Sequence, residues 1–235
     1  MGGVAMSDAD AWWAVLVSIK VALVAVLGML VPGVITAWWL ARSRSRWSAV
    51  VESMVSLPLV LPPVVVGYLL LRILGRRGWL GGFLHDHLGI DLVFTWWAAA
   101  IASAVMGYPL LVRSTRLAIE LVDRDLERAA ASAGAGPIRT FIRVTLPLAL
   151  PGVLAGSILA FARSLGEFGA TILVAGNLPG STRTLSLAIW TETQDPAGQD
   201  RVIVLVLFSV GLSVAAMIVA ELLGRRLERR LGRRR

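Results

Sequence analysis

Long runs of apolar residues alternate with shorter polar segments along most of this chain. Five runs hold the roughly 20 apolar residues that a helix needs to cross a hydrocarbon core of about 30 Å. They cover about residues 12–40, 50–71, 94–112, 148–174 and 202–223. Prolines inside these runs are tolerated in membranes, because neighbouring helices and polar side chains satisfy the freed carbonyl groups. The pattern predicts an all-α polytopic membrane protein with about five transmembrane helices.

The polar segment between the third and fourth runs, about residues 113–147, is too long to be a simple connection. Its stretch LERAAASAGAGPIRT (126–140) places leucine and alanine at helical spacing and predicts a helix over 125–133, followed by a turn at two glycines and a proline. Small residues on one face of this helix allow close docking into a groove of another protein. A helix that lies on the membrane surface is the alternative that these residues leave open.

The composition agrees with a membrane protein and narrows the possible chemistry. Hydrophobic residues make up 57% of the chain and charged residues 16%, which leaves too little polar surface for a soluble domain of this length. The chain has no cysteine, which excludes disulfides and thiolate metal sites. Its two histidines lie in one polar loop. We therefore expect no metal site and no cofactor.

The arginines indicate the orientation in the membrane. Sixteen of them lie in the segments at about 41–49, 113–147 and 224–235, whereas the segments on the opposite side hold five. The richer side is expected to be cytoplasmic, which puts the N-terminus outside and the C-terminus inside.

This orientation divides the chain into a periplasmic N-terminal segment (1–11), a transmembrane domain (12–224) and a basic cytoplasmic tail (225–235). The net charge of +8 is explained by arginines that anchor the topology near anionic lipid of the bilayer. We therefore expect no nucleic-acid partner.

An ion pair is expected within the fourth run. Arg163 and Glu167 lie four residues apart, and ionisable groups inside a membrane are candidate functional groups. At this spacing they can also simply neutralise each other. Glycines flank Glu167 and are expected to break the helix, where free backbone N–H groups with the hydroxyls of Ser164 and Thr171 would form a low-affinity relay for an anion. The candidate path residues in this run are Arg163, Gly166, Glu167, Gly169 and Thr171.

Two further segments carry candidate features. Pro62 and Pro63 predict either a bend that lines a path through the membrane or a kink packed against a neighbouring helix. Residues 177–200 form a loop on the side opposite the arginine-rich segments, and a short helix over 185–193 is expected within it.

The polar segment carries a known family pattern. The cytoplasmic loop of importer-type ABC-transporter permeases reads Glu-Ala-Ala, three residues, Gly, nine residues, then Ile-x-Leu-Pro. This chain fits the pattern at Ala129, Ala130, Gly134, Leu146 and Pro147, with Val144 in place of the isoleucine, Arg128 at the usual Glu position and Glu127 one residue earlier. The chain therefore resembles these permeases.

The resemblance implies a type I ABC importer permease fold. The loop at about 120–147 would hold a coupling helix that fits into a cleft of a separate ATPase subunit. The implied ATPase-coupling residues are Glu127, Ala129, Ala130, Gly134 and Gly136.

Three longer blocks are similar to the molybdate branch of these permeases. They read SLPLVLPPVVVGYLLL (56–71), MGYPLLVRSTRLAIE (106–120) and LAFARSLGEFGATILVAGNLPGSTRTLSLAIW (159–190). The resemblance implies import of molybdate, and also of tungstate, across the bacterial cytoplasmic membrane. It implies a homodimer with two ATP-binding subunits and a periplasmic molybdate-binding protein. Sulfate and thiosulfate permeases share the ARxxGEFG core, so sulfate or thiosulfate is the alternative substrate.

Two other classes of protein remain to be weighed. A phosphate-binding P-loop needs a lysine, and the single lysine of this chain is Lys20 in the first apolar run, so the chain is not itself an ATPase. A secondary anion transporter driven by an ion gradient would need inverted repeats or coupling carboxylates at the midplane, and the sequence contains neither. An intramembrane enzyme would need a Ser/His, metal-ligand or paired-acid group in the apolar runs, and these runs contain no such group. We therefore expect no catalytic residue.

Overall fold

The computed structural model describes residues 8–43, 45–196 and 198–232. These residues form helices and turns without any strand, which confirms the all-α class. The elements in chain order are α1 (Asp8–Arg42), α2 (Trp47–Val60), α3 (Pro63–Leu74), α4 (Trp79–Leu88), α5 (Trp96–Glu120), α6 (Arg124–Ser132), α7 (Pro137–Thr140), the π-helix η1 (Phe141–Thr145), α8 (Leu146–Leu165), α9 (Gly169–Ala175), α10 (Leu185–Thr193) and α11 (Gln199–Gly232).

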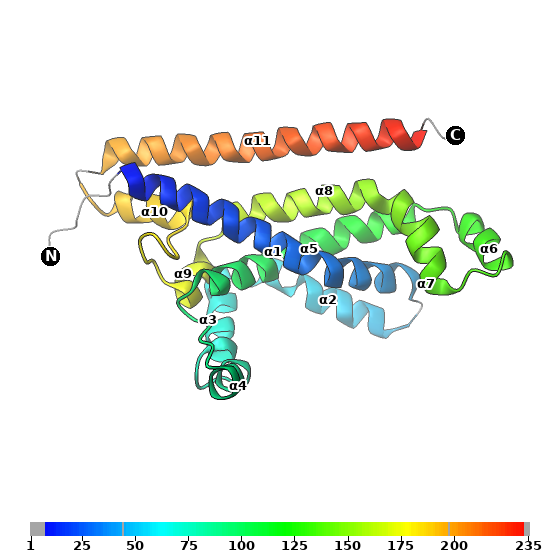
Figure 1. Cartoon of the computed structure of the whole chain (residues 1–235), viewed down its shortest axis with the longest axis horizontal. Helices are drawn as coiled ribbons and strands as arrows, with labels where there is room; N and C mark the ends of the chain where they lie inside the picture. Colours follow the sequence, from blue (N-terminus) through cyan, green and yellow to red (C-terminus); the bar gives the residue numbers. More distant parts are fainter. Residues whose placement is uncertain (1–7, 44, 197, 233–235) are drawn as a thin grey trace.

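The centre of the molecule is a bundle in which α5 packs along both α1 and α8 (Figure 1). The buried residues of α5 are mostly small, and so are those that face it. A Cβ on Gly107 of α5 would lie 3.3 Å from the carbonyl oxygen of Ala160, and a Cβ on Gly156 of α8 would lie 3.0 Å from that of Leu111. Glycine at these two positions lets the helix backbones approach closely, as in other membrane bundles.

The length and hydropathy of the helices support a polytopic protein. In the described part of the chain, three helical stretches are long and apolar enough to cross a membrane by themselves: Asp10–Arg42, Pro137–Leu165 and Gln199–Val219. The bent pair Trp47–Val60 and Pro63–Leu88 is a fourth if it counts as one span. The third expected run forms α5, which has 25 residues but is less apolar. Because α5 lies inside the bundle, small alanines serve there in place of larger apolar side chains.

Two expected spans are interrupted, and both interruptions lie at residues that disfavour a helix. The second run was expected to extend to about residue 71, but α2 ends at Val60 and α3 starts at Pro63 with a bend of 111°. Pro62 has an extended backbone because a proline follows it, and Pro63 has no N–H to continue the helix. The fourth run was expected to extend to about residue 174, but α8 ends at Leu165 and α9 is a separate helix. The break predicted at Gly166 is confirmed.

The ends of the chain differ slightly from the expected boundaries. The helix α1 begins at Asp8, so part of the expected 1–11 segment is helical, and residues 1–7 lie outside the described residues. The helix α11 continues through Gly232 into the expected basic tail, of which 233–235 also lie outside. Figure 1 shows that α1 and α11 begin at the same end of the molecule, and that α6 and α7 lie at the opposite end, where α11 ends.

Candidate functional site

The first candidate site is the polar loop, residues 121–145, which carries the expected helix as α6. The Asp123 side chain accepts a hydrogen bond from the backbone N–H of Asp125 (2.9 Å) and caps the start of α6. The helix ends before Gly134, whose φ of +83° is a conformation that glycine adopts without strain. No residue of α6 is buried, and Ala129 and Gly136 are exposed while Ala130 is partly exposed. The described part of the chain therefore leaves the small-residue face of α6 open.

Glu127 differs from the other expected coupling residues because its side chain is turned toward the bundle. Its Oε1 accepts a hydrogen bond from Arg42 Nη2 at the end of α1 (2.7 Å) and another from Thr145 Oγ1 in η1 (2.6 Å). The same Arg42 nitrogen donates to the carbonyl oxygen of Ile119 in α5 (3.1 Å). The sequence pattern grouped Glu127 with the outward-facing alanines, and it gave no signal for Arg42 or Thr145 as its partners.

Arg128, which stands at the usual Glu position of the family pattern, lies on the outer surface. Its guanidinium forms an ion pair with Asp125 at 2.8 Å, and both side chains are exposed. An exposed pair three residues apart contributes little to stability. The outward position at this point of the pattern is therefore basic and accessible.

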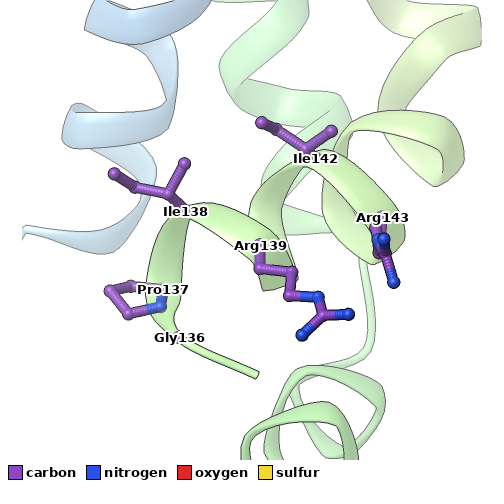
Figure 2. A pocket seen from close by; sticks show the side chains of 6 residues that line it. All are labelled: Gly136, Pro137, Ile138, Arg139, Ile142 and Arg143. Carbon is purple, nitrogen blue, oxygen red and sulfur yellow. The ribbon is translucent and has the colours of Figure 1, made fainter. Parts of the chain in front are cut away.

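Next to α6 the polar loop forms an open apolar groove of about 520 Å³. Figure 2 shows that Ile138 and Ile142 point to one side of this helical turn and that Arg139 and Arg143 point to the other. The exposed fractions of Ile138 and Ile142 are 67% and 56%, and both residues lie at the start of the apolar stretch Pro137–Leu165. The groove is lined by Gly136, Pro137, Ile138, Arg139, Ile142 and Arg143.

Sequence reasoning identified Gly136 in this groove but missed the isoleucines and arginines. Both pairs are spaced four residues apart directly after a proline that starts a helix, and this spacing is the signal that could have identified them.

The second candidate site surrounds the break between α8 and α9. Arg163 Nη1 and Glu167 Oε2 form the expected ion pair at 2.8 Å. The Glu167 side chain is 1% exposed and that of Arg163 is 28% exposed. Glu167 Oε1 also accepts a hydrogen bond from the backbone N–H of Ala170 (2.9 Å), which caps the first turn of α9. The pair is thus neutralised within the chain, and one N–H group of the expected anion relay is already occupied.

The two helix breaks lie against each other. A Cβ on Gly169 would come within 2.9 Å of Pro63 Cβ, and a Cβ on Gly67 would come within 2.8 Å of the Ala170 backbone. Small residues in α9 and a glycine in α3 therefore allow these two helices to pack closely. This contact brings together the expected path residues of both segments, which lie about a hundred residues apart in the sequence.

The remaining expected path residues differ in their exposure. Pro62 and Gly166 are exposed, whereas Thr171 is fully buried and its hydroxyl has no hydrogen-bond partner among the described residues. The Ser164 hydroxyl donates to the carbonyl oxygen of Ala160 in its own helix (2.8 Å). In this conformation the hydroxyls of Thr171 and Ser164 therefore lie inside the bundle and not along an open path.

The expected helix of the 177–200 loop is confirmed as α10 and is held by polar side chains. Asn177 Nδ2 donates to Thr191 Oγ1 (2.7 Å), and Arg183 Nε donates to Asn177 Oδ1 (2.9 Å). The backbone N–H of Leu185 donates to Ser18 Oγ (2.7 Å), which fixes the start of α10 to α1. The loop is therefore an ordered surface, and no pattern along the chain had singled out Asn177 or Arg183.

Comparison with known proteins places the fold. Residues 33–229 match the family described as binding-protein-dependent transport system inner membrane component. Solved structures with a similar fold include a bacterial ABC transporter that imports alginate (TM-score 0.73, 18% identity, 94% of this chain and 80% of that chain). They also include the MetNI methionine ABC transporter in an inward-facing conformation (TM-score 0.72, 17% identity, 94% of this chain and 99% of that chain).

Curated relatives match over most of the sequence. The molybdenum transport system permease protein ModB of Escherichia coli K12 is 50% identical over 209 residues, which cover 89% of this chain and 91% of that protein. The ModB proteins of Haemophilus influenzae and Mycobacterium tuberculosis are each 44% identical over 207 residues. These alignments cover 88% of this chain, with 90% of the first protein and 76% of the second. The chain therefore belongs to the family of binding-protein-dependent transport system inner membrane components, with the fold of a type I ABC importer permease.

Proposed function

We propose that this chain is the membrane-spanning permease subunit of an ATP-driven importer that carries molybdate into the cytoplasm. The observation that carries this proposal is the 50% identity with the Escherichia coli molybdenum transport permease along nearly the full length of both proteins. Residues 33–229 match a family of transport components of the inner membrane, and this match supports transport through the membrane as the activity.

ATP hydrolysis belongs to a separate subunit in this proposal. The single lysine of the chain, Lys20, lies 3.6 Å from the centre of the Trp96 ring and is not part of a phosphate-binding loop. The open small-residue face of α6 and the adjacent groove supply a surface for this subunit. Ala129 and Ala130 permit close approach, while Ile138 and Ile142 provide apolar contacts.

The full importer would contain two copies of this permease, two ATPase subunits and a periplasmic binding protein. One neighbouring structure is described as an alginate transporter in complex with a periplasmic protein that holds its substrate. Only 6% of the apolar stretch of α11 is buried within the chain, so most of this stretch is available to contact lipid or a second copy. The polar loop and the basic end of α11 lie at one end of the molecule, which supports a cytoplasmic C-terminus and an outer N-terminus (Figure 1).

Molybdate and tungstate are tetrahedral dianions of similar size, so a path that passes the first is expected to pass the second. Sulfate has the same charge and shape but is smaller. A permease contacts its anion only transiently, whereas a binding protein can surround a desolvated anion with fixed donors. Most discrimination against sulfate is therefore expected in the binding protein.

The test is transport by the purified complex in proteoliposomes. The permease is reconstituted with its ATPase subunit and its periplasmic binding protein. We expect ATP hydrolysis to be faster with molybdate-loaded binding protein than with the empty form. Labelled molybdate should accumulate, tungstate should compete for uptake, and sulfate in large excess should compete poorly. Uptake of sulfate without any response to molybdate would contradict the substrate while leaving the ABC permease assignment intact.

A further inference from the structure

In the polar loop, the side chain of Glu127 faces the membrane helices. Glu127 is the fourth residue of the exposed helix after its capped start, and its side chain is 19% exposed. One oxygen of its carboxylate receives two hydrogen bonds, from Arg42 at 2.7 Å and from Thr145 at 2.6 Å. A single group of α6 therefore contacts both the end of α1 and the end of η1, directly before α8.

Arg42 extends this contact to a third membrane helix. The nitrogen that donates to Glu127 also donates to the carbonyl oxygen of Ile119, in the last turn of α5. A cation is favourable at this position because the carbonyl groups at a helix C-terminus carry partial negative charge. The Arg42 side chain is 20% exposed, so the ion pair with Glu127 is less screened by water than a surface pair.

Thr145 connects Glu127 to the base of α8. It is 1% exposed and lies in the π-helix that precedes α8. π-Helical turns interrupt the regular α-helical register and are often found at functional positions. Beside it, Phe141 packs on Trp38 of α1 with a centroid distance of 4.6 Å. The start of α8, the end of α1 and α6 are thus joined within one small region.

The other charged pair of α6 provides a contrast. Asp125 and Arg128 pair with each other, and both side chains are more than 70% exposed. The segments that flank α6, residues 121–123 and 133–136, are not helical, and Gly134 adopts a positive φ. Besides the contacts of Glu127, α6 is attached to the bundle by these two short segments and by its packing against α7 and η1.

We propose that Glu127, Arg42 and Thr145 form a clasp that transmits displacement of α6 to the membrane helices α1, α5 and α8. The proposal rests on the proposed function, since it takes α6 to be the helix that the ATPase subunit moves. In this view the exposed side of α6 that carries Ala129 binds the ATPase subunit, and Glu127 is a positioning residue on the opposite, inward side. Loss of the clasp should leave docking intact while separating ATP hydrolysis from transport.

The first experiment measures coupling in the reconstituted complex with Glu127→Ala. Its matched control is the double variant Asp125→Asn/Arg128→Gln, which removes an ion pair of the same helix that does not reach the bundle. We expect both variants to copurify with the ATPase. Stimulation of hydrolysis by loaded binding protein should fall by about fivefold or more in Glu127→Ala alone, the size of a typical coupling free energy. Loss of the ATPase from Glu127→Ala but not from the control would overturn the clasp, because Glu127 would then be a docking contact.

A second experiment needs neither ATPase nor molybdate, so its outcome is independent of the proposed function. The chain has no cysteine, and spin labels can be attached to Ala131→Cys in α6 and Ala49→Cys in α2, both exposed positions. We expect a narrow distribution of label distances in the parent protein and in the control, and a broad one in Glu127→Ala. The conservative variant Glu127→Gln, which keeps an acceptor oxygen for Arg42 and Thr145, should broaden it less than Glu127→Ala. An equally narrow distribution in Glu127→Ala would show that the clasp does not hold α6.

Discussion

Glu167 keeps a carboxylate almost completely buried, and two contacts within the chain make this position tolerable. Arg163 supplies the opposite charge at 2.8 Å, and the N–H of Ala170 supplies a hydrogen bond at 2.9 Å. A buried charge that loses its partner is far more costly than a buried pair. The same carboxylate caps α9, which packs through Gly169 against Pro63. The pair therefore fixes the contact between the two helix breaks.

This role predicts a specific order of stability among variants. Arg163→Ala should destabilise the protein by about 1–3 kcal/mol, because it leaves a buried charge with a single hydrogen bond. Adding Glu167→Gln should recover part of this loss, since glutamine keeps an acceptor for the Ala170 N–H and carries no charge. Apparent melting temperatures in detergent measure the order. Additive losses in the double variant would indicate that the two residues act independently.

For the Arg163–Glu167 pair, the sequence predicted the two partners but not the residues that surround them. The spacing of four residues identified the Arg163–Glu167 pair, and the glycines identified the break. The cap on Ala170 and the contact of Gly169 with Pro63 depend on how α9 turns back onto α3, and no local pattern encodes that turn. The backbone N–H of Ala170, one of the groups expected in an anion relay, is occupied by Glu167.

The helix α6 was identifiable from its own residues, because its alanines, its acidic start and the glycine after it are all local signals. The prediction of 125–133 differs from the observed α6 by one residue at each end. The adjacent groove was not predictable, since η1 is a π-helix whose register depends on tertiary contacts of Phe141 and Thr145. The break of the second span was foreseeable from Pro62 and Pro63, whereas the size of the bend was not.

The docking role of α6 predicts that bulk on its alanine face will block the ATPase subunit. Ala129 is exposed, so Ala129→Trp should prevent copurification while the permease keeps its melting temperature. Ala131→Trp places the same bulk on the other side of the helix and should copurify normally. Gly134 is less suitable for this test, because its φ of +83° strains any substitution. Normal copurification and transport by Ala129→Trp would refute the docking face.

The whole molecule shows why fold and substrate must be argued separately. Its architecture is close to that of alginate and methionine importers, at 18% and 17% identity, so very different substrates are carried by one arrangement of helices. The apolar runs predicted membrane helices, and the resemblance of the polar loop to the family pattern implied this fold. They did not reveal that α5 is enclosed by α1 and α8, because that depends on how glycines and alanines of separate helices meet. The substrate rests on sequence similarity to molybdenum permeases alone.

The energy source of transport is the most direct test of this account. Proteoliposomes that contain the full complex are filled with ATP, ADP or buffer, and labelled molybdate with its binding protein is added outside. We predict accumulation only with ATP inside, and none when the ATPase subunit carries a substitution of its P-loop lysine. A proton or sodium gradient imposed without ATP should drive no uptake. Molybdate accumulation driven by such a gradient in the absence of ATP would contradict the account.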